Sequence, residues 1–365
     1  MTPIEDAAIG SVVVVGTGLI GTSIALALRQ RDVRVFLADR DPAAVRLARE
    51  LGAGEDWTGD SRADLAVVAV PPQFVAQQLL DLQKRDAARV YTDVASVKVL
   101  PLAQAAQLGC DLTAYVAGHP LAGRERSGPA AARADLFLGR PWAYCPTPEA
   151  APEAVAAVEG LIALCGGNAV RVDAGEHDRA VAVVSHAPHV TAAAVAARLA
   201  EAPDAALGLS GQGVRDVTRI AASDPALWTG ILSGNAIPVA EVLEAVVADL
   251  SAAARALRAL AGDGNAVGDV TDLLSRGVAG TSRIPGKHGG PARTYAVVQV
   301  VIGDRPGELA RLVQAAGETG VNIEDIRLEH APGLPVGAAE LYVQPEAAAA
   351  LTEGLRERGW QVPTS

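Results

Sequence analysis

The chain has 365 residues, and at roughly 150 residues per domain it is expected to fold as two or three domains. Hydrophobic residues make up 50% and charged residues 20%, which excludes the composition of a disordered protein. The 31 basic and 42 acidic residues give a net charge of −11 at pH 7, which argues against a broad electrostatic surface for nucleic acid or membrane. Because the protein is acidic as a whole, an anionic substrate would have to be bound by a few arginines within its own site.

Cysteine usage and the N-terminus indicate a reducing compartment. Cys110, Cys145 and Cys165 are odd in number and form no Cys-x-x-Cys pair, so neither a disulfide framework nor a metal site of the zinc type is expected. Residues Met1 to Ile9 carry acids and lack a basic region followed by an apolar run, so no signal peptide is predicted. We expect a cytoplasmic protein.

One apolar stretch needs to be weighed as a membrane span. Residues 180–197 contain no Asp, Glu, Lys or Arg and approach the length of a spanning helix. The same stretch contains His186, Pro188 and His189 and is rich in alanine, which favours a buried helix of a helical domain. We predict no transmembrane segment.

Short apolar runs alternate with helical periodicity over residues 1–173. The predicted strands are Ile9–Val15, Val33–Ala38, Leu65–Val70, Val90–Val94, Tyr115–Ala117, Trp142–Cys145 and Asn168–Val172. Strands that alternate with helices predict an α/β domain with a parallel, doubly wound sheet of the Rossmann type.

Strand signals stop after this domain, and residues 174–283 are predicted to form a nearly all-helical domain. Ser223-Asp224-Pro225 has the pattern of an N-cap with proline in the first turn. The apolar residues between Val239 and Leu260 have helical spacing over about six turns, which is longer than a surface helix usually needs. This helix is expected to form a core and also the seam of a homodimer.

A glycine- and proline-rich linker over residues 284–293 separates a third unit, residues 294–365. The expected elements of that unit are a strand over Thr294–Ile302, a helix over Gly307–Gly320, strands over Val321–Glu329 and Ala338–Val343, and a helix over Pro345–Arg358. With a short last strand near Trp360, this is a βαββαβ pattern.

A glycine motif links the first predicted strand to the first helix. Gly16-x-Gly18-x-x-Gly21 follows the strand directly and opens a helix over Thr22–Arg29. Gly16 permits the tight turn, Gly18 lets backbone amides approach a pyrophosphate, and Gly21 lets the helix pack closely. In this context the motif predicts a dinucleotide-binding site.

Asp39 ends the second predicted strand about twenty residues after the glycines. Its carboxylate would accept hydrogen bonds from the adenosine ribose and repel a 2′-phosphate, which favours NAD, while the adjacent Arg40 keeps NADP as an alternative. The predicted cofactor-binding residues are Gly16, Gly18, Leu19, Ile20, Gly21, Asp39, Val70, Pro71 and Ser96.

Further motifs follow in a specific order along nearly the whole chain. They are Thr92-Asp93-Val94-Ala95-Ser96-Val97-Lys98, the segment from Gly118-His119-Pro120 to Gly128, Glu176-His177-Asp178, Ser185-His186-Ala187-Pro188-His189, Arg215-Asp216-Val217-Thr218-Arg219-Ile220, Ser223-Asp224-Pro225 and Trp228. Together with the glycine turn, this set resembles prephenate and arogenate dehydrogenases, which oxidatively decarboxylate a cyclohexadienol on the route to tyrosine.

The chemistry of that family requires a base for the ring hydroxyl. His119 follows a predicted strand at the carboxyl end of the sheet and can accept a proton near neutral pH, so it is the predicted catalytic base. The resemblance implies that Ser96 orients this imidazole and lies beside the nicotinamide.

The two carboxylates of prephenate require cations, and guanidinium groups suit bidentate recognition of carboxylate. The resemblance implies that Arg219 binds the ring carboxylate, that Asp178 pairs with Arg219, and that His189 lies near the substrate side chain. Arg215, one helical turn before Arg219, is a further substrate-binding candidate. Trp228 is expected either to wall the substrate pocket or to belong to the core.

The third unit resembles an ACT domain, a regulatory module that binds amino acids between copies. The residues that would form such a site are Asp304, Pro306, Gly307, Asn322 and Ile323. Backbone amides at a helix start can hold an amino-acid carboxylate. Feedback by tyrosine is the hypothesis, and a unit that serves only oligomer contacts is the alternative.

The leading interpretation is a cytoplasmic, homodimeric, NAD-dependent prephenate dehydrogenase with an ACT regulatory domain. Arogenate, which has an ammonium in place of the keto group, is the alternative substrate. Two remoter alternatives are an enzyme for a 4-amino analogue and a catalytically silent sensor of dinucleotide and amino acid. The sensor is disfavoured because it would not need Ser96, His119 and Arg219 together.

Overall fold

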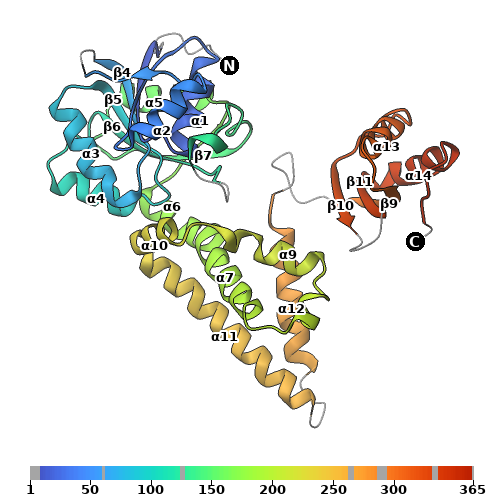
Figure 1. Ribbon diagram of the computed structural model, residues 1–365. Coiled ribbons are helices and arrows are strands. Elements are labelled where there is room, and N and C mark those ends of the chain that lie inside the picture. The colour runs from blue at the N-terminus through green and yellow to red at the C-terminus, as the bar shows by residue number, and fades with distance from the viewer. Residues whose placement is uncertain are drawn as a thin grey trace. The chain divides into compact units, whose positions relative to one another are not determined.

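An eight-stranded sheet organises the first part of the chain, with strand order β3-β2-β1-β4-β5-β6-β7-β8 (Figure 1). The computed structural model describes residues 9–59, 62–123, 128–261, 267–285, 294–330 and 336–363. The strands of this sheet are β1 (Ser11–Val15), β2 (Arg34–Ala38), β3 (Glu55–Asp56), β4 (Ala63–Val68), β5 (Ala88–Asp93), β6 (Tyr115–Pro120), β7 (Pro141–Cys145) and β8 (Asn168–Arg171). Every predicted strand of this domain is present, and β3 is an addition.

The direction of β7 corrects the prediction of a wholly parallel sheet. Strand β7 pairs antiparallel with β6, whereas the other neighbouring strands are parallel. A parallel crossover normally carries a helix that spans the sheet. The described residues between β6 and β7 form only the three-residue turn η1 (Pro129–Ala131), so the chain returns beside β6 in the opposite direction.

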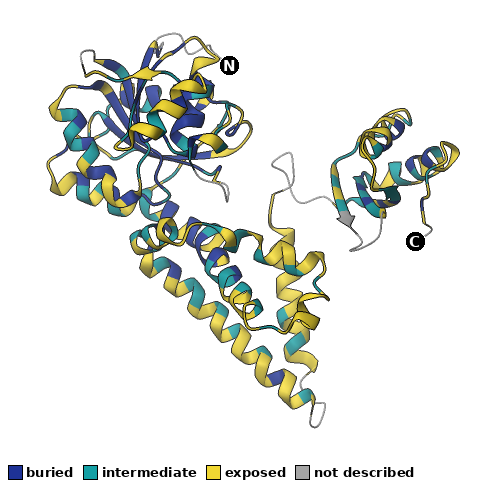
Figure 2. Cartoon of the chain, viewed as in Figure 1, coloured by how far each residue is buried: buried dark blue, intermediate teal, exposed yellow. Residues whose placement is uncertain are grey.

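Helices cover both faces of the sheet. They are α1 (Leu19–Arg29), α2 (Pro42–Glu50), α3 (Pro72–Lys84), α4 (Val99–Gln107) and α5 (Pro152–Leu164). Successive residues of β1 point to opposite faces: Val12 and Val14 pack in the core with α1 and α5, and Val13 packs in the core with α3 and α4. The central strands β1, β4, β5 and β6 are accordingly mostly buried (Figure 2), as expected for a doubly wound domain, whereas β3 and β8 at the two edges are exposed.

The next segment is helical, as predicted. Its elements are α6 (Ala174–Val181), the π-helical turn η2 (Ala182–His186), α7 (Ala187–Leu199), α8 (Asp204–Leu207), α9 (Gln212–Thr218), the 3-10 turn η3 (Arg219–Ala222), α10 (Pro225–Gly234) and α11 (Ala236–Leu260). Asp224 caps α10 because its side chain accepts a hydrogen bond from the backbone N–H of Ala226 at 2.8 Å. The predicted cap with proline in the first turn is confirmed.

The continuous helical run from Ala174 to Leu199 is long and apolar enough, by length and composition, to cross a membrane. Helices α10 and α11 would pass the same test only as one span, despite a bend of 99° between them. The run nevertheless buries His177, Asp178 and His186 in polar contacts within the first part of the protein. Such polar contacts are typical of a helix that packs inside a folded domain.

The chain divides into two compact units, Met1–Ala248 and Asp249–Ser365, and the division falls within α11. Besides the end of α11, the second unit contains α12 (Val267–Ser282), β9 (Ala296–Gly303), α13 (Glu308–Gly317), β10 (Asp325–His330), β11 (Val336–Val343), the 3-10 turn η4 (Pro345–Ala347) and α14 (Ala348–Glu357). Most of the predicted linker, residues 286–293, lies outside the described residues.

The last elements form a small antiparallel sheet with strand order β10-β11-β9. The predicted last strand is reduced to a single bridge between Gln361 and Val301 on the free edge of β9. Leu312, Leu341 and Leu355 are fully buried in a core of this unit's own. The βαββα order is therefore confirmed.

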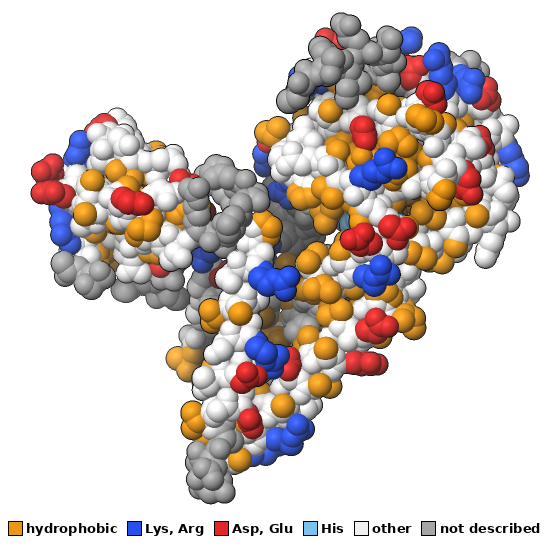
Figure 3. Space-filling model, turned by 180° about the vertical axis from the view of Figure 1, so that it is seen from behind, with side chains coloured by type: hydrophobic (Ala, Val, Ile, Leu, Met, Phe, Trp, Pro, Cys, Tyr) orange, Lys and Arg blue, Asp and Glu red, His pale blue; other side chains and the backbone are white. Residues whose placement is uncertain are grey.

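Hydrophobic side chains remain exposed on the long helices. Ile237, Val247 and Leu250 of α11 are 71%, 60% and 57% exposed, and Leu274 and Val278 of α12 are 65% and 73% exposed. Figure 3 shows such side chains between the charged ones along these helices. Apolar surface of this kind is typical of a helix that has a partner.

Candidate active site

The glycine turn lies between β1 and α1, as predicted. Gly16 has a φ of +102°, and a Cβ there would lie 2.2 Å from the carbonyl oxygen of Ala69. A Cβ on Gly21 would lie 1.9 Å from the carbonyl oxygen of Gly16. Gly18 differs because a Cβ there would meet nothing within 4 Å, and as the N-cap of α1 it leaves the helix without a side-chain cap. Open space beside uncapped helical N–H groups suits the pyrophosphate of a dinucleotide.

Asp39 follows β2 and holds the glycine turn. Its Oδ2 accepts hydrogen bonds from the backbone N–H of Thr17 at 2.6 Å and from the Thr17 hydroxyl at 3.1 Å. Its Oδ1 accepts from the backbone N–H of Asp41 at 3.0 Å. The carboxylate is thus fixed next to the turn, at the position where a ribose would lie.

The other predicted cofactor-binding residues border the same turn. Leu19 is buried and Ile20 is half-buried in the first turn of α1. Val70 and Pro71 lie between β4 and α3, and a Cβ on Gly16 would lie 3.3 Å from the Val70 side chain. The structure therefore brings these residues together.

His119 is a residue of β6 (Tyr115–Pro120) itself, whereas the sequence prediction places it just after a strand that ends at Ala117. The strand extends to Pro120 because β7 pairs with it, with Ala143 opposite His119. The imidazole is 9% exposed, and its Nδ1 lies 2.9 Å from Nε2 of His177. The two rings meet edge to face, with centroids 5.1 Å apart.

Burial lowers the pKa of His119 well below 6.5, and the nearby His177, Lys98 and His186 lower it further. Desolvation disfavours the imidazolium form, and a nearby positive charge such as the ammonium of Lys98 does the same. At neutral pH His119 is therefore uncharged, which is the form that can accept a proton.

Asp178 of α6 is 2% exposed and caps helix α4 from 79 residues away in the chain. Its Oδ1 accepts from the backbone N–H of Lys98 at 2.8 Å, and its Oδ2 accepts from that of Val99 at 2.9 Å. Its Oδ1 also lies 2.7 Å from Nδ1 of His177. This carboxylate thus anchors α4 and His177, and its expected pairing with Arg219 stays a prediction.

Ser96 lies in the loop between β5 and α4 and is half-buried. Its predicted role is to orient His119. Among the described residues the hydrogen-bonding partner of that imidazole is His177, through Nδ1. The Nε2 atom of His119 is the remaining ring nitrogen for contact with Ser96 or with a substrate, so a contact with Ser96 stays a prediction.

A buried ion pair lies beneath this loop. The ammonium of Lys98 is 2.5 Å from Oδ1 of Asp93 and 2.5 Å from the carbonyl oxygen of Gly118, and both charged side chains are fully buried. Asp93 also accepts from the Tyr115 hydroxyl at 2.6 Å and from the backbone N–H of Ala95 at 2.8 Å. These contacts tie the end of β5 to β6 directly beside His119.

A second polar group joins the helices. Nδ2 of Asn235 donates to the carbonyl oxygen of Asp178 at 2.7 Å and lies 3.1 Å from Nδ1 of His186. Burial lowers the pKa of His186 from 6.5 to about 4, so its neutral Nδ1 can accept from the amide. Asn235, between α10 and α11, thereby joins the corner of these two helices to the run formed by α6 and η2.

His189 and Trp228 form a stacked pair. Their ring centroids are 3.5 Å apart with an angle of 8° between the planes, and the edge of His186 meets Trp228 at 6.0 Å. Nδ1 of His189 is buried without a hydrogen-bond partner within the described part of the chain. Burial lowers the pKa of His189. Trp228 is half-buried against the two imidazole rings. Nδ1 of His189 is then a buried polar atom that a ligand could satisfy.

The π-helical turn η2 sets the register of these side chains. A π turn adds one residue per turn and is frequent at functional sites. Here it brings Asp178, Ala182, His186 and His189 to the buried side of one helical run. Asp178 and His189 therefore lie on one face of this run.

Arg215 on α9 and Arg219 at the start of η3 are both exposed. Both elements pack on α7, the helix that carries His189. Their predicted roles toward substrate carboxylates remain predictions.

His177, Asn235 and the pair of Lys98 with Asp93 received no role from the sequence, although three of these residues lie in the motifs. A signal was present for the ion pair, because Asp93 lies inside a mostly apolar predicted strand and Lys98 is one of only three lysines in the chain. Asn235 carried no comparable signal.

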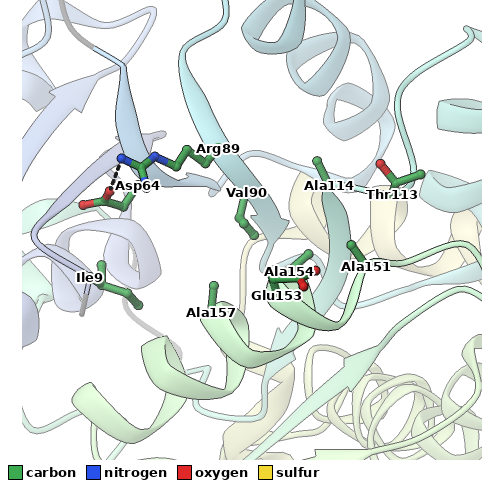
Figure 4. A pocket seen from close by; sticks show the side chains of 10 residues that line it. All are labelled: Ile9, Asp64, Arg89, Val90, Thr113, Ala114, Ala151, Glu153, Ala154 and Ala157. Carbon is green, nitrogen blue, oxygen red and sulfur yellow. Dashed lines mark ion pairs between the residues drawn. The ribbon is translucent and has the colours of Figure 1, made fainter. Parts of the chain in front are cut away.

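A cavity of about 390 Å³ lies elsewhere, at the amino ends of β4 and β5 and beside α5 (Figure 4). Asp64 and Arg89, which line it, form an ion pair of 3.8 Å. Ligands of doubly wound sheets bind at the carboxyl ends of the strands. This cavity is therefore separate from the site around His119.

The fold and the glycine turn define a dinucleotide-binding protein with a helical domain that completes a histidine-rich site. Comparisons with known proteins agree: residues 24–171 match the family model of the prephenate dehydrogenase nucleotide-binding domain, and residues 173–268 match that of the prephenate dehydrogenase dimerization domain. The chain is 42% identical to a probable prephenate dehydrogenase, NovF, of Streptomyces niveus, over 95% of this chain and 98% of the relative. The chain belongs to the prephenate dehydrogenase family, whose members are oxidoreductases.

Two solved structures are also similar. Prephenate dehydrogenase from A. aeolicus, in complex with hydroxyphenyl propionate and NAD⁺, has a TM-score of 0.66 at 26% identity and covers 76% of this chain and 99% of its own. Synechocystis arogenate dehydrogenase has a TM-score of 0.60 at 26% identity and covers 74% of this chain and 98% of its own. About a quarter of this chain thus lies outside either structural match.

Proposed function

We propose that this protein catalyses the NAD-dependent oxidative decarboxylation of prephenate to 4-hydroxyphenylpyruvate in the cytoplasm. The observation that carries the proposal is the neutral, buried imidazole of His119 at the carboxyl end of the sheet, in line with His177 and Asp178. Bound NAD would supply the hydride acceptor at the glycine turn. His119 takes the proton of the ring hydroxyl at Nε2 as the hydride and the ring carboxylate leave.

The substrate is held by the helical domain. Arg219 is proposed to bind the ring carboxylate, with Arg215 as a second cation on the same segment. Ser96 is proposed to lie beside the nicotinamide and to orient the imidazole of His119. His189 and Trp228 are proposed to hold the side chain of the substrate, because the buried Nδ1 of His189 needs a polar partner.

Prephenate is favoured over arogenate at this end of the site. The rings of His186, His189 and Trp228 carry no negative charge, and burial lowers the pKa of both imidazoles. The ammonium of arogenate would have to be desolvated against neutral rings, whereas the keto group of prephenate can accept a hydrogen bond from one of them.

The test is the initial rate of NADH formation with prephenate and with arogenate at matched concentrations, with NAD and NADP compared in parallel. We expect a clear preference for prephenate and NAD. A preference for arogenate would overturn the substrate assignment and leave the family chemistry intact. In the His119→Asn variant, loss of the base is expected to lower kcat by about 10²- to 10⁴-fold.

We further propose that the long helices form a homodimer seam and that residues 294–363 form an ACT-type regulatory module. The exposed apolar residues of α11 and the βαββα order support these two assignments. Gly307, with a φ of +86°, caps α13 beside the exposed Asp304 and Pro306, and Asn322 and Ile323 precede β10. Tyrosine is the proposed effector. Sedimentation and titration of activity and Tm with tyrosine test both assignments.

A further inference from the structure

We propose that His177 is a positioning residue. It donates a hydrogen bond to the carboxylate of Asp178 and accepts one from Nδ1 of His119, and it thereby keeps the proton of His119 on Nδ1. The inference rests on the proposed function, because it assigns His119 as the base. It concerns three groups in a row: Asp178 Oδ1, His177 with both ring nitrogens engaged, and His119 Nδ1, separated by 2.7 and 2.9 Å.

The carboxylate of Asp178 defines the direction of the chain of hydrogen bonds. Both of its oxygens accept backbone N–H groups of Lys98 and Val99, which begin helix α4. An ionised carboxylate has no proton to donate, and the N-terminus of a helix stabilises its negative charge. The proton between Asp178 and His177 therefore resides on Nδ1 of His177.

The remaining protons follow from the chemistry of imidazole. A neutral imidazole has one N–H, so Nε2 of His177 is an acceptor when Nδ1 is a donor. The contact of 2.9 Å between Nε2 of His177 and Nδ1 of His119 then requires the proton on Nδ1 of His119. With both rings neutral, Nε2 of His119 carries a lone pair and is the atom that can take a proton.

This arrangement serves proton transfer in two ways. Before the reaction, it fixes His119 in the tautomer that can accept a proton at Nε2. When the O–H bond of the substrate breaks and an Nε2–H bond forms, His119 becomes an imidazolium whose Nδ1–H still points at the lone pair of His177, with the charge of Asp178 behind it. The same logic explains why an oriented acceptor behind a catalytic histidine matters in serine proteases.

The tautomer is measured directly by long-range proton–nitrogen NMR of the full-length protein labelled with ¹⁵N-histidine, without substrate. The chain has six histidines, and the His119 signals are identified by their loss in His119→Gln. We expect wild-type His119 to be protonated on Nδ1. Protonation on Nε2, or a doubly protonated His177, would overturn the proposal.

Asp178→Asn tests the negative charge behind the two rings. Oδ1 of Asp178 accepts from both Lys98 and His177, whereas Oδ2 accepts from Val99 alone. The amide oxygen of the variant is therefore expected to keep the place of Oδ1 and the hydrogen bond from Nδ1 of His177. We expect His119 to stay protonated on Nδ1 and kcat to fall by at least about tenfold, because the imidazolium that forms in the reaction loses the charge behind it. The Kd for NADH should stay within about twofold of wild type. A His119 that carries its proton on Nε2 in this variant, or an unchanged kcat, would overturn the proposal.

A matched pair at His177 separates positioning from packing. In His177→Gln the amide oxygen can take the place of Nε2 and accept from His119, whereas in His177→Asn the amide is too short to reach it. We expect the Gln variant to keep the Nδ1-protonated tautomer of His119 and at least about tenfold more of the wild-type kcat than the Asn variant. Equal activity and equal tautomers in the two variants would refute the role of His177. If wild-type protein turns over neither prephenate nor arogenate, the proposed function fails, while the tautomer measurement still decides this inference.

Discussion

The ammonium of Lys98 and the carboxylate of Asp93 form an ion pair of 2.5 Å in which both side chains are fully buried. Such a pair is stable only if the remaining hydrogen-bonding capacity is satisfied. Gly118 and Tyr115 of β6 complete it from one side and Ala95 from the other. The pair therefore fixes the distance between two strand ends that carry the proposed catalytic groups.

Lys98→Met leaves the carboxylate of Asp93 buried without its cation, so we expect the free energy of unfolding to fall by about 3–5 kcal/mol. Urea denaturation measures the change. Lys84→Met is the matched control, because Lys84 at the end of α3 is exposed, and it should change stability by less than about 0.5 kcal/mol. Equal losses in the two variants would contradict a structural role for the buried pair.

The pH dependence of the reaction should reflect the low pKa of His119. Burial and the neighbouring His177, Lys98 and His186 all favour its neutral form, while Asp178 faces the far side of His177. Since the base is active when neutral, kcat/KM is expected to stay flat from neutral pH to well below pH 6.5 and to fall only in more acidic solution. A limb centred at or above pH 6.5 would show that His119 is not the titrating base or is not buried in solution.

Local sequence determines much of this structure. The β-branched runs predict the strand positions, and the spacing from Gly16 to Asp39 predicts the cofactor turn, because both patterns depend on short-range geometry. The antiparallel direction of β7 depends on a connection that lacks a long helix, and the contact of His119 with His177 joins residues 58 positions apart. The anchoring of α4 by Asp178 spans 79 positions in the same way. Such partners are set by tertiary packing, and no periodicity in one chain encodes them.

His186 should make the stability of the protein depend on pH. Its pKa is about 4 in the folded protein and 6.5 without burial, so between these values the unfolded state binds more protons than the native state. Stability is therefore fully present above pH 6.5 and is lost as the pH falls toward 4. From pH 7 to pH 5 this one group contributes a loss of about 2 kcal/mol.

His186→Gln removes that titration. The unfolding free energy of the wild type minus that of the variant should therefore fall by about 2 kcal/mol as the pH falls from 7 to 5. Urea denaturation at several pH values measures it. The absolute stability of the variant is immaterial, because lost packing against Trp228 shifts all pH values alike. A difference that is the same at both pH values would contradict the burial of a neutral His186.

Gly16 and Gly18 offer a pair in which the same substitution tests two different demands. Gly16→Ala places a Cβ 2.2 Å from the carbonyl oxygen of Ala69 at a φ of +102°, so it should reduce the free energy of unfolding by at least about 2 kcal/mol.

In Gly18→Ala the added Cβ meets no protein atom within 4 Å, and Tm should barely change. The added methyl group instead occupies the space beside the N-terminus of α1 where a pyrophosphate would lie. We expect the Kd for NAD to rise by roughly tenfold or more, equivalent to about 1.4 kcal/mol. Calorimetric titration with NAD and thermal unfolding of both variants separate the two effects, and a Gly18→Ala variant that binds NAD as wild type does would remove the glycine turn from the cofactor site.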